Sequence, residues 1–243
     1  MDDYKFINPL NKKEKFKIYE YYNYSVIEPS DHFYKKCLVF FAGFNENAAK
    51  YIYLFKNYFE KSEINFKIKI IIPMLNSYLP GEYVPNQYIN AEKVGKVYSW
   101  VSYKEDENNK GKFVWKTDTK KDEMIKNLIN KEIKKLNDCS QNIIFVGFSM
   151  GGRYLLKILN EMKIKTLFNL LLKTMVLDQD EYVSKNNQIF TLFSRYDKIV
   201  GWENIGKTYN NLKLSFENVR LKLDNGKKHS VDYVCMDYLQ FLM

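Results

Sequence analysis

The stretch "IIFVGFSMGGRYLLKIL", residues 143–159, joins two different hydrophobic patterns and decides the fold. Its first part is a continuous apolar run that ends at a glycine, which is typical of a strand buried on both faces of a sheet. Its second part has apolar residues at helical spacing. Ser149 stands where the two patterns meet, with Gly147 and Gly151 two residues away on either side. A polar side chain at such an abrupt change of direction suggests a chemical role.

The two glycines explain how the turn can be so tight. A Cβ at Gly147 or Gly151 would collide with the backbone, whereas the strained turn presents the Ser149 hydroxyl above the sheet edge. The amide N–H groups that open the following helix point at the same place. This pattern is the G-x-S-x-G nucleophile elbow. The alternative, a phosphate-binding turn, has little support because neither G-x-x-x-x-G-K-[ST] nor G-x-G-x-x-G is present.

The rest of the chain alternates between strand patterns and helix patterns. We expect strands within residues 14–28, 37–43, 66–73, 141–147, 170–178, 188–194 and 218–223. We expect helices within residues 46–61, 119–138, 150–162, 202–214 and 230–242. This order predicts an α/β fold with a mostly parallel central sheet and helices on both faces. Residues 1–243 form a single domain in this interpretation, and residues 74–118 form a long irregular insertion or a lid.

Composition narrows the class of protein. No apolar run reaches the length of a membrane span, and no secretory signal is evident, so we expect a soluble protein. The three cysteines are scattered, which favours reduced thiols and the cytoplasm, with mitochondria as the alternative through an unrecognised address. No metal-site spacing and no cofactor motif is found. We therefore predict neither a metal nor a cofactor.

The formal charge of +9 is spread over lysines that alternate with acids. We interpret these lysines as solvated helix faces, with weak association with an anionic membrane surface as the alternative. No nucleic-acid motif accompanies the charge, so we expect no nucleic-acid partner.

A serine nucleophile requires a base, and the chain offers only two histidines, His32 and His229. Hydrolases with this elbow have the order serine, acid, histidine. Only His229, in a predicted turn before the last helix, satisfies that order. Asp197 follows an apolar strand and is the expected acid partner. Asp178 is the alternative one strand earlier, and Asp224, at the end of the last strand, is a weaker one.

Acyl transfer also requires N–H donors for the oxyanion. One is expected from the backbone of Met150, directly after the serine. The other is expected from Phe44, in the loop after the first buried strand. An ordinary turn in which Asn45 or Asn47 caps the next helix is an alternative interpretation of that loop, and both can hold.

With these residues in place, the chain resembles the α/β-hydrolase superfamily and, within it, the phospholipase/carboxylesterase family that includes acyl-protein thioesterases. The segments that carry the resemblance are "LVFFAGFNENA", "YSWVSYKEDENN", "IIFVGFSMGG", "TLFSRYDKIVGWENIGKTYNNLK" and "GKKHSVDYVCMDYLQFL". The resemblance implies hydrolysis of an ester or thioester of a lipid or an acylated protein through an acyl-serine intermediate. It assigns Ser149 as nucleophile, Asp197 as acid and His229 as base.

Several positions depart from the family pattern. Ala42 replaces a histidine before Gly43, Met150 replaces a glutamine, and Arg153 stands where a small residue is usual. A catalytically silent subunit with a structural role in a larger protein complex is therefore a second hypothesis. Different chemistry on the same fold, such as carbon–carbon hydrolysis or a lipase with a lid, is a third.

Overall fold

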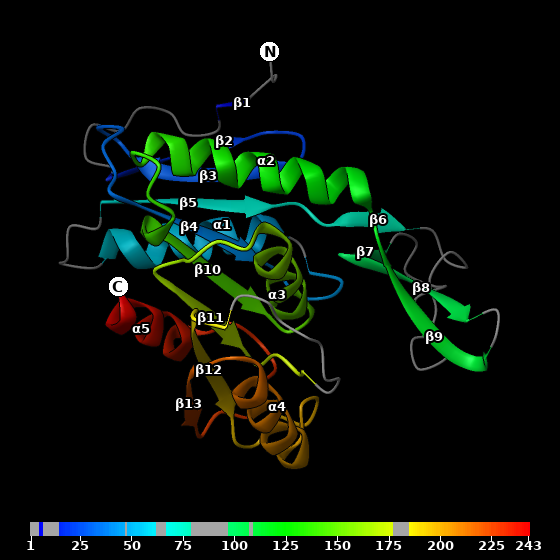
Figure 1. The fold of residues 1–243 in the computed structure, drawn as a ribbon. Helices are drawn as coiled ribbons and strands as arrows, with labels where there is room; N and C mark the ends of the chain where they lie inside the picture. Colours follow the sequence, from blue (N-terminus) through cyan, green and yellow to red (C-terminus); the bar gives the residue numbers. More distant parts are fainter. Residues whose placement is uncertain are drawn as a thin grey trace.

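The computed structural model describes residues 5–6, 15–46, 48–61, 67–78, 97–106, 109–176 and 185–243. These residues build a nine-stranded mixed sheet with helices packed against it (Figure 1). In spatial order the strands are β1 (Lys5–Phe6), β2 (Phe16–Glu20), β3 (Tyr24–Pro29), β5 (Ile68–Pro73), β4 (Lys36–Phe41), β10 (Ile143–Phe148), β11 (Phe168–Leu172), β12 (Gln188–Ser194) and β13 (Asn218–Asp224).

The strands from β5 to β13 run parallel, whereas β1, β2 and β3 add antiparallel pairings at one edge. Strand β10 lies between β4 and β11, and all of its residues are buried. Its apolar composition follows from this position, because both of its faces are covered. Since parallel strands end at the same edge, the segments after β4, β10, β11, β12 and β13 meet there.

The helices described are α1 (Ala48–Lys61), α2 (Thr119–Lys135), α3 (Met150–Met162), α4 (Trp202–Ser215) and α5 (Tyr233–Leu242). Two neighbouring residues of β4 show that the sheet is covered on both faces. Phe40 packs on Tyr51 of α1, and Phe41 packs on Tyr154 of α3. Successive side chains of a strand point to opposite faces, so α1 and α3 lie on opposite sides. The mostly parallel sheet with helices on both faces that the sequence predicts is confirmed.

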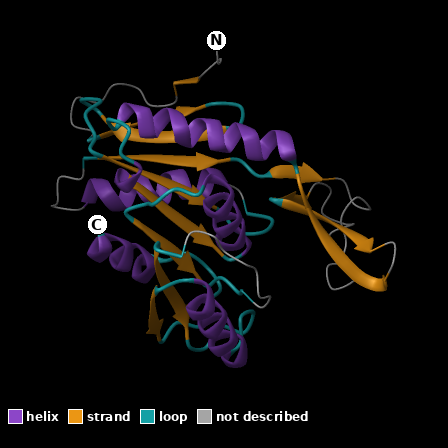
Figure 2. Cartoon of the chain, viewed as in Figure 1, coloured by secondary structure: helices purple, strands orange, loops and turns teal. Residues whose placement is uncertain are grey.

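The segment between β5 and α2 differs from the irregular insertion that we predicted. Strands β6 (Asn76–Tyr78) and β7 (Val97–Ser99) pair antiparallel, and β8 (Val101–Asp106) with β9 (Asn109–Thr117) forms a hairpin. The hairpin projects from the body of the molecule (Figure 2). In its register the backbone of Tyr103 lies opposite that of Trp115. The expectation of irregular structure was therefore wrong for these strands. Residues 79–96 and 107–108 lie outside the described part, and the lid stays a prediction.

Candidate active site

The backbone at Ser149 is held in an uncommon conformation at the end of β10. Its φ of 52° and ψ of −120° lie in a region that serine rarely adopts. A Cβ placed on Gly147 would lie 2.5 Å from the Cα of Gly152. A Cβ placed on Gly151 would lie 2.1 Å from the carbonyl oxygen of Phe41. Both glycines are thus required by close backbone approach, and the Ser149 side chain is half-buried at the sheet edge.

The structure brings the three predicted side chains into one hydrogen-bonded row. His229 Nε2 lies 2.9 Å from Ser149 Oγ, and His229 Nδ1 lies 2.7 Å from Asp197 Oδ2. Asp197 lies in the loop after β12, and His229 lies between β13 and α5. With Nδ1 protonated and donating to Asp197, Nε2 is free to accept the serine proton. This arrangement can transfer a proton away from the Ser149 hydroxyl.

Asp197 is itself fixed by the backbone. Its side chain is 1% exposed, and Oδ1 accepts hydrogen bonds from the N–H groups of Ile199 at 2.9 Å and Val200 at 3.3 Å. Burial raises the pKa of Asp197, but the bond to His229 and those from the two N–H groups outweigh burial and lower it below its usual value. The carboxylate therefore stays ionised beside the imidazole at neutral pH.

The alternatives to these residues lie elsewhere. His32 is exposed, and its Nδ1 lies 2.7 Å from Glu28 Oε1. Asp224 ends β13 and accepts a hydrogen bond from the N–H of Gly226, within its own turn. Asp178 lies outside the described residues.

The predicted oxyanion segment lies against the elbow. A Cβ on Gly43 would lie 2.8 Å from the Phe148 ring, and one on Gly151 would lie 2.3 Å from the carbonyl oxygen of Ala42. The loop that carries Phe44 and the start of α3 at Met150 are therefore neighbours. Asn45 has a φ of 52°, and its N–H donates to the carbonyl of Tyr98 at 2.7 Å. Strand β7 thus holds this loop.

Trp100 also fixes the loop that carries Phe44, through a contact with Ala42. This role was not predicted from the sequence. The indole Nε1–H of Trp100 donates to the carbonyl of Ala42 at 2.7 Å. Its ring stacks on Tyr154 of α3 with a centroid separation of 4.6 Å. Trp100 is 2% exposed, so both contacts are shielded from water. The one signal in the sequence was that Trp100 lies in "YSWVSYKEDENN", a segment that carries the family resemblance.

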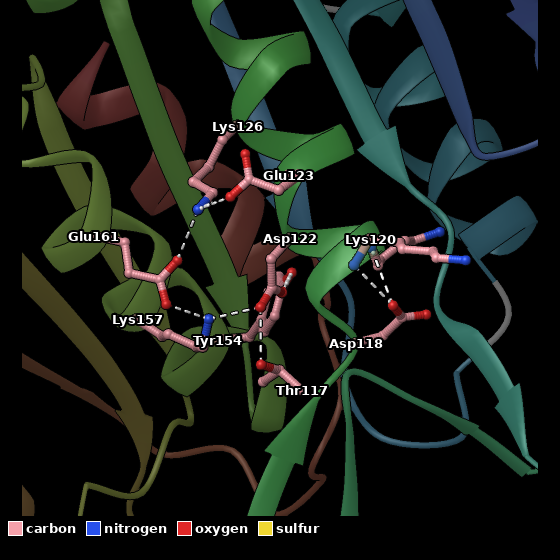
Figure 3. A network of polar contacts seen from close by, with 10 residues as sticks. Thr117, Asp118, Lys120, Asp122, Glu123, Lys126, Tyr154, Lys157 and Glu161 are labelled. Atoms are coloured by element: carbon pink, nitrogen blue, oxygen red, sulfur yellow. Dashed lines mark hydrogen bonds and ion pairs between the residues drawn. The ribbon is translucent and has the colours of Figure 1, made fainter.

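Tyr154 is in turn anchored by a polar network between α2 and α3 (Figure 3). Its hydroxyl donates to Asp122, which also accepts from Lys157 at 2.7 Å and from Thr117 at 2.8 Å. Burial, together with the bond to Asp122, raises the pKa of Tyr154 well above its usual value, so the hydroxyl stays a donor. The network links α2 through Tyr154 and Trp100 to the loop at Ala42.

Within the described ranges, no group of three or more histidine, cysteine, aspartate or glutamate side chains could hold a metal ion. The helices of the same residues include none that is long and apolar enough to cross a membrane. Arg153, which departs from the family pattern, is half-buried on α3.

Comparison with known proteins gives a family match over most of the chain. Residues 22–242 match the model of a family described as phospholipase/carboxylesterase. The chain belongs to this family. Phospholipases and carboxylesterases cleave esters, so the chain is a hydrolase of the esterase type with an α/β-hydrolase fold. No curated protein sequence matches the chain significantly.

Solved structures of the same fold are similar over most of the chain. SOBER1 from Arabidopsis thaliana superposes with a TM-score of 0.65 at 16% identity, covering 85% of this chain and 96% of its own. Acyl-protein thioesterase 2 from Zea mays gives a TM-score of 0.60 at 16% identity, covering 90% and 96%. A carboxylesterase from Mesorhizobium loti gives 0.59 at 14% identity, covering 96% and 97%. At these identities the likeness concerns the fold.

Proposed function

We propose that this family member hydrolyses a carboxylic ester or thioester through an acyl-serine intermediate. The single observation that carries the proposal is the position of His229, within hydrogen-bond distance of Ser149 Oγ on one side and Asp197 Oδ2 on the other. A solvated or structural histidine has no need of both contacts. No cofactor enters the mechanism.

In the first half-reaction, Ser149 Oγ attacks the carbonyl carbon of the substrate while His229 Nε2 accepts the hydroxyl proton. The Asp197 carboxylate stabilises the imidazolium that results. The negative charge on the carbonyl oxygen is stabilised by the backbone N–H groups of Phe44 and Met150, a contribution of several kcal/mol in comparable enzymes. The imidazolium then donates its proton to the leaving alcohol or thiol as the bond to the carbonyl carbon breaks.

In the second half-reaction, water takes the place of the alcohol or thiol. His229 accepts a proton from the water as its oxygen attacks the acyl carbon, and the same proton then returns to Ser149 Oγ as the acid leaves. The products are a carboxylic acid and the regenerated serine.

The surface beside Asp197 supports an apolar acyl substrate. Tyr196, Ile199 and Trp202 lie in the same loop or at the start of α4, and each has more than half of its surface exposed. Lys198, which is also exposed, lies between Tyr196 and Ile199 in the sequence. Large apolar side chains exposed next to a site are typical of surfaces that receive apolar ligands. We therefore propose lipids or acylated proteins as the substrate class, with weak attraction to an anionic membrane surface.

Labelling by a fluorophosphonate probe tests the reaction type. Wild type should label at Ser149, and Ser149→Ala should not label. A panel of p-nitrophenyl esters of increasing chain length then reports the acyl preference, with Ser149→Ala as the control. Absence of both labelling and hydrolysis in folded wild-type protein would contradict the proposal and favour the silent subunit of a protein complex.

A second comparison separates thioesterase from carboxylesterase activity. An S-acylated peptide and its O-acyl serine counterpart carry the same acyl chain and differ only in the leaving group. A higher kcat/KM for the S-acyl peptide supports an acyl-protein thioesterase, and a higher value for the oxygen ester supports a carboxylesterase.

A further inference from the structure

A lysine that the proposed mechanism does not use lies at the end of β11, the strand next to the elbow strand. The side chain of Lys173 is 0% exposed, which is rare for a charged residue. Its backbone has a φ of 50°, and its N–H donates to the carbonyl of Leu192 at 2.8 Å. A buried ammonium group requires polar partners, because burial without them is costly.

The partners of the Lys173 ammonium group lie in the segment that carries His229. Its Nζ donates to the carbonyl oxygens of Lys228 and Ser230, both at 2.8 Å. The Asp232 carboxylate lies 3.6 Å from Nζ and balances the charge. The two carbonyls belong to the residues immediately before and after His229. The ammonium group therefore fixes the backbone on both sides of the imidazole.

The same end of β11 also contacts the elbow. The N–H of Ser149 donates to the carbonyl of Leu172 at 2.9 Å. A Cβ placed on Gly152 would lie 2.0 Å from Thr174 Oγ1, so the start of α3 packs directly on Thr174. Residues 172–174 thus hold the serine through the backbone of Leu172 and the histidine through the side chain of Lys173.

We propose that Lys173 is a positioning residue that sets the distance between His229 and Ser149. The proposal rests on the proposed function for its catalytic consequence, but its structural content concerns only the orientation of His229. An apolar side chain of similar length would fill the space and leave the carbonyls of Lys228 and Ser230 without their donor. The His229 segment would then lose the contact that fixes it relative to β11.

Lys173→Met tests this role, because methionine preserves length while removing the charge and the donors. We expect kcat for a p-nitrophenyl ester to fall on the order of 100-fold, the usual effect of a small misplacement of a reacting group. KM should be nearly unchanged, because Lys173 lies beneath the loop and is not exposed to substrate. The rate of fluorophosphonate labelling should fall by the same factor.

Lys69→Met is the matched control for loss of a buried lysine. Lys69 Nζ donates to Glu132 at 2.9 Å, and its side chain is 8% exposed. In the sheet register Lys69 lies opposite Cys37, and Cys37 lies opposite Ile143. Ile143 begins β10, so Lys69 is at the end of the sheet away from Ser149. We expect this variant to lower the melting temperature and to leave kcat unchanged below that temperature.

A measurement that does not need activity decides the positioning role independently. In a His32→Gln background, His229 is the only histidine, so the proton on its Nδ1 can be observed in an NMR spectrum of ¹⁵N-histidine-labelled protein. Hydrogen bonding to Asp197 should move this proton far downfield in wild type and in Lys69→Met. The signal should be lost or shifted in Lys173→Met.

The outcomes separate the two proposals. If wild type neither labels nor hydrolyses esters, the proposed function fails, and the NMR comparison still decides whether Lys173 orients His229. If wild type is active and folded Lys173→Met keeps both the wild-type kcat and the downfield signal, the positioning role is overturned. An equal loss of kcat in Lys69→Met would also overturn it, because general destabilisation would then explain the effect.

Discussion

Ser149 stores backbone strain at the point where chemistry is proposed. Its φ of 52° is in the range that glycine adopts freely and other residues adopt at a cost of about 1–3 kcal/mol. The surrounding contacts hold it there: the Ser149 N–H donates to the carbonyl of Leu172, and Gly147 and Gly151 permit the close backbone approach that the turn needs. The strain places the hydroxyl 2.9 Å from His229. The conformation that aligns the Ser149 hydroxyl with His229 therefore lowers the stability of the folded protein.

Ser149→Gly should therefore increase stability while removing the nucleophile. We expect the free energy of unfolding to rise by about 1 kcal/mol, because glycine relieves the strain at this φ. Urea unfolding at pH 7 measures the change, with Ser149→Ala as the control that keeps the strain. Equal stability of the glycine and alanine variants would contradict a strained elbow.

Asp197→Asn should have little effect on the geometry and a large effect on the rate. An amide cannot stabilise the imidazolium, and it favours the wrong tautomer of His229, so kcat should fall on the order of 10⁴-fold. Steady-state kinetics on a short p-nitrophenyl ester measures this. A loss of less than tenfold would contradict the assigned role.

The same variant has a predicted effect on the pH dependence of stability. The lowered pKa of Asp197 means that the folded state keeps the carboxylate ionised where the unfolded chain takes up a proton. The stabilisation is fully present at pH values above the pKa of the aspartate in the unfolded chain, about 3.9. It is lost as the pH falls through the pKa of Asp197 in the folded protein. The difference in unfolding free energy between wild type and Asp197→Asn should therefore narrow below about pH 4. Unfolding by urea at several pH values tests it.

At the scale of elements, the position of the proposed oxyanion loop depends on a segment that lies outside the main sheet. Strand β7 accepts the N–H of Asn45, and Trp100 donates to Ala42. Both contacts come from the segment between β5 and α2, which also continues into the projecting hairpin. Movement of this segment would therefore move Phe44, the proposed oxyanion donor of that loop.

Trp100→Phe should affect catalysis and stability together. Phenylalanine fills most of the space but lacks the indole N–H, so the buried carbonyl of Ala42 loses its donor at a cost of about 1–3 kcal/mol. Because the loop at Phe44 is then less well fixed, kcat should fall more than KM changes. Kinetics and thermal unfolding measure the two effects. Unchanged kcat in a destabilised variant would show that the loop does not depend on Trp100.

At the scale of the whole molecule, much of the architecture follows from the sequence. Buried parallel strands are continuous apolar runs, so the strands that surround Ser149 are recognisable without a structure. The scarcity of histidine singles out His229. The hairpin after Trp100 was not predicted, because its alternating aromatic and charged residues resemble a polar loop. Lys173 was missed for another reason: it lies inside the strand expected at residues 170–178, which in the structure ends at Leu172, and lysine side chains usually reach solvent.

The three cysteines give a test of the packing of the whole chain. Cys37 and Cys235 are fully buried, whereas Cys139 is partly exposed before β10. Burial raises the pKa of Cys235 to about 12 and raises that of Cys37 further. A thiol reagent should therefore modify Cys139 rapidly in native protein and all three cysteines in guanidinium. Rapid reaction of a second thiol in the native state would contradict this packing.

The order of the strands has a consequence for biosynthesis. Ser149 is synthesised 80 residues before His229, the imidazole that would activate it, which follows β13. The growing polypeptide therefore carries a serine hydroxyl without its base until the segment around His229 has been translated and packs against Lys173. Under the proposed function, we therefore expect a nascent chain that ends before His229 not to react with a fluorophosphonate probe.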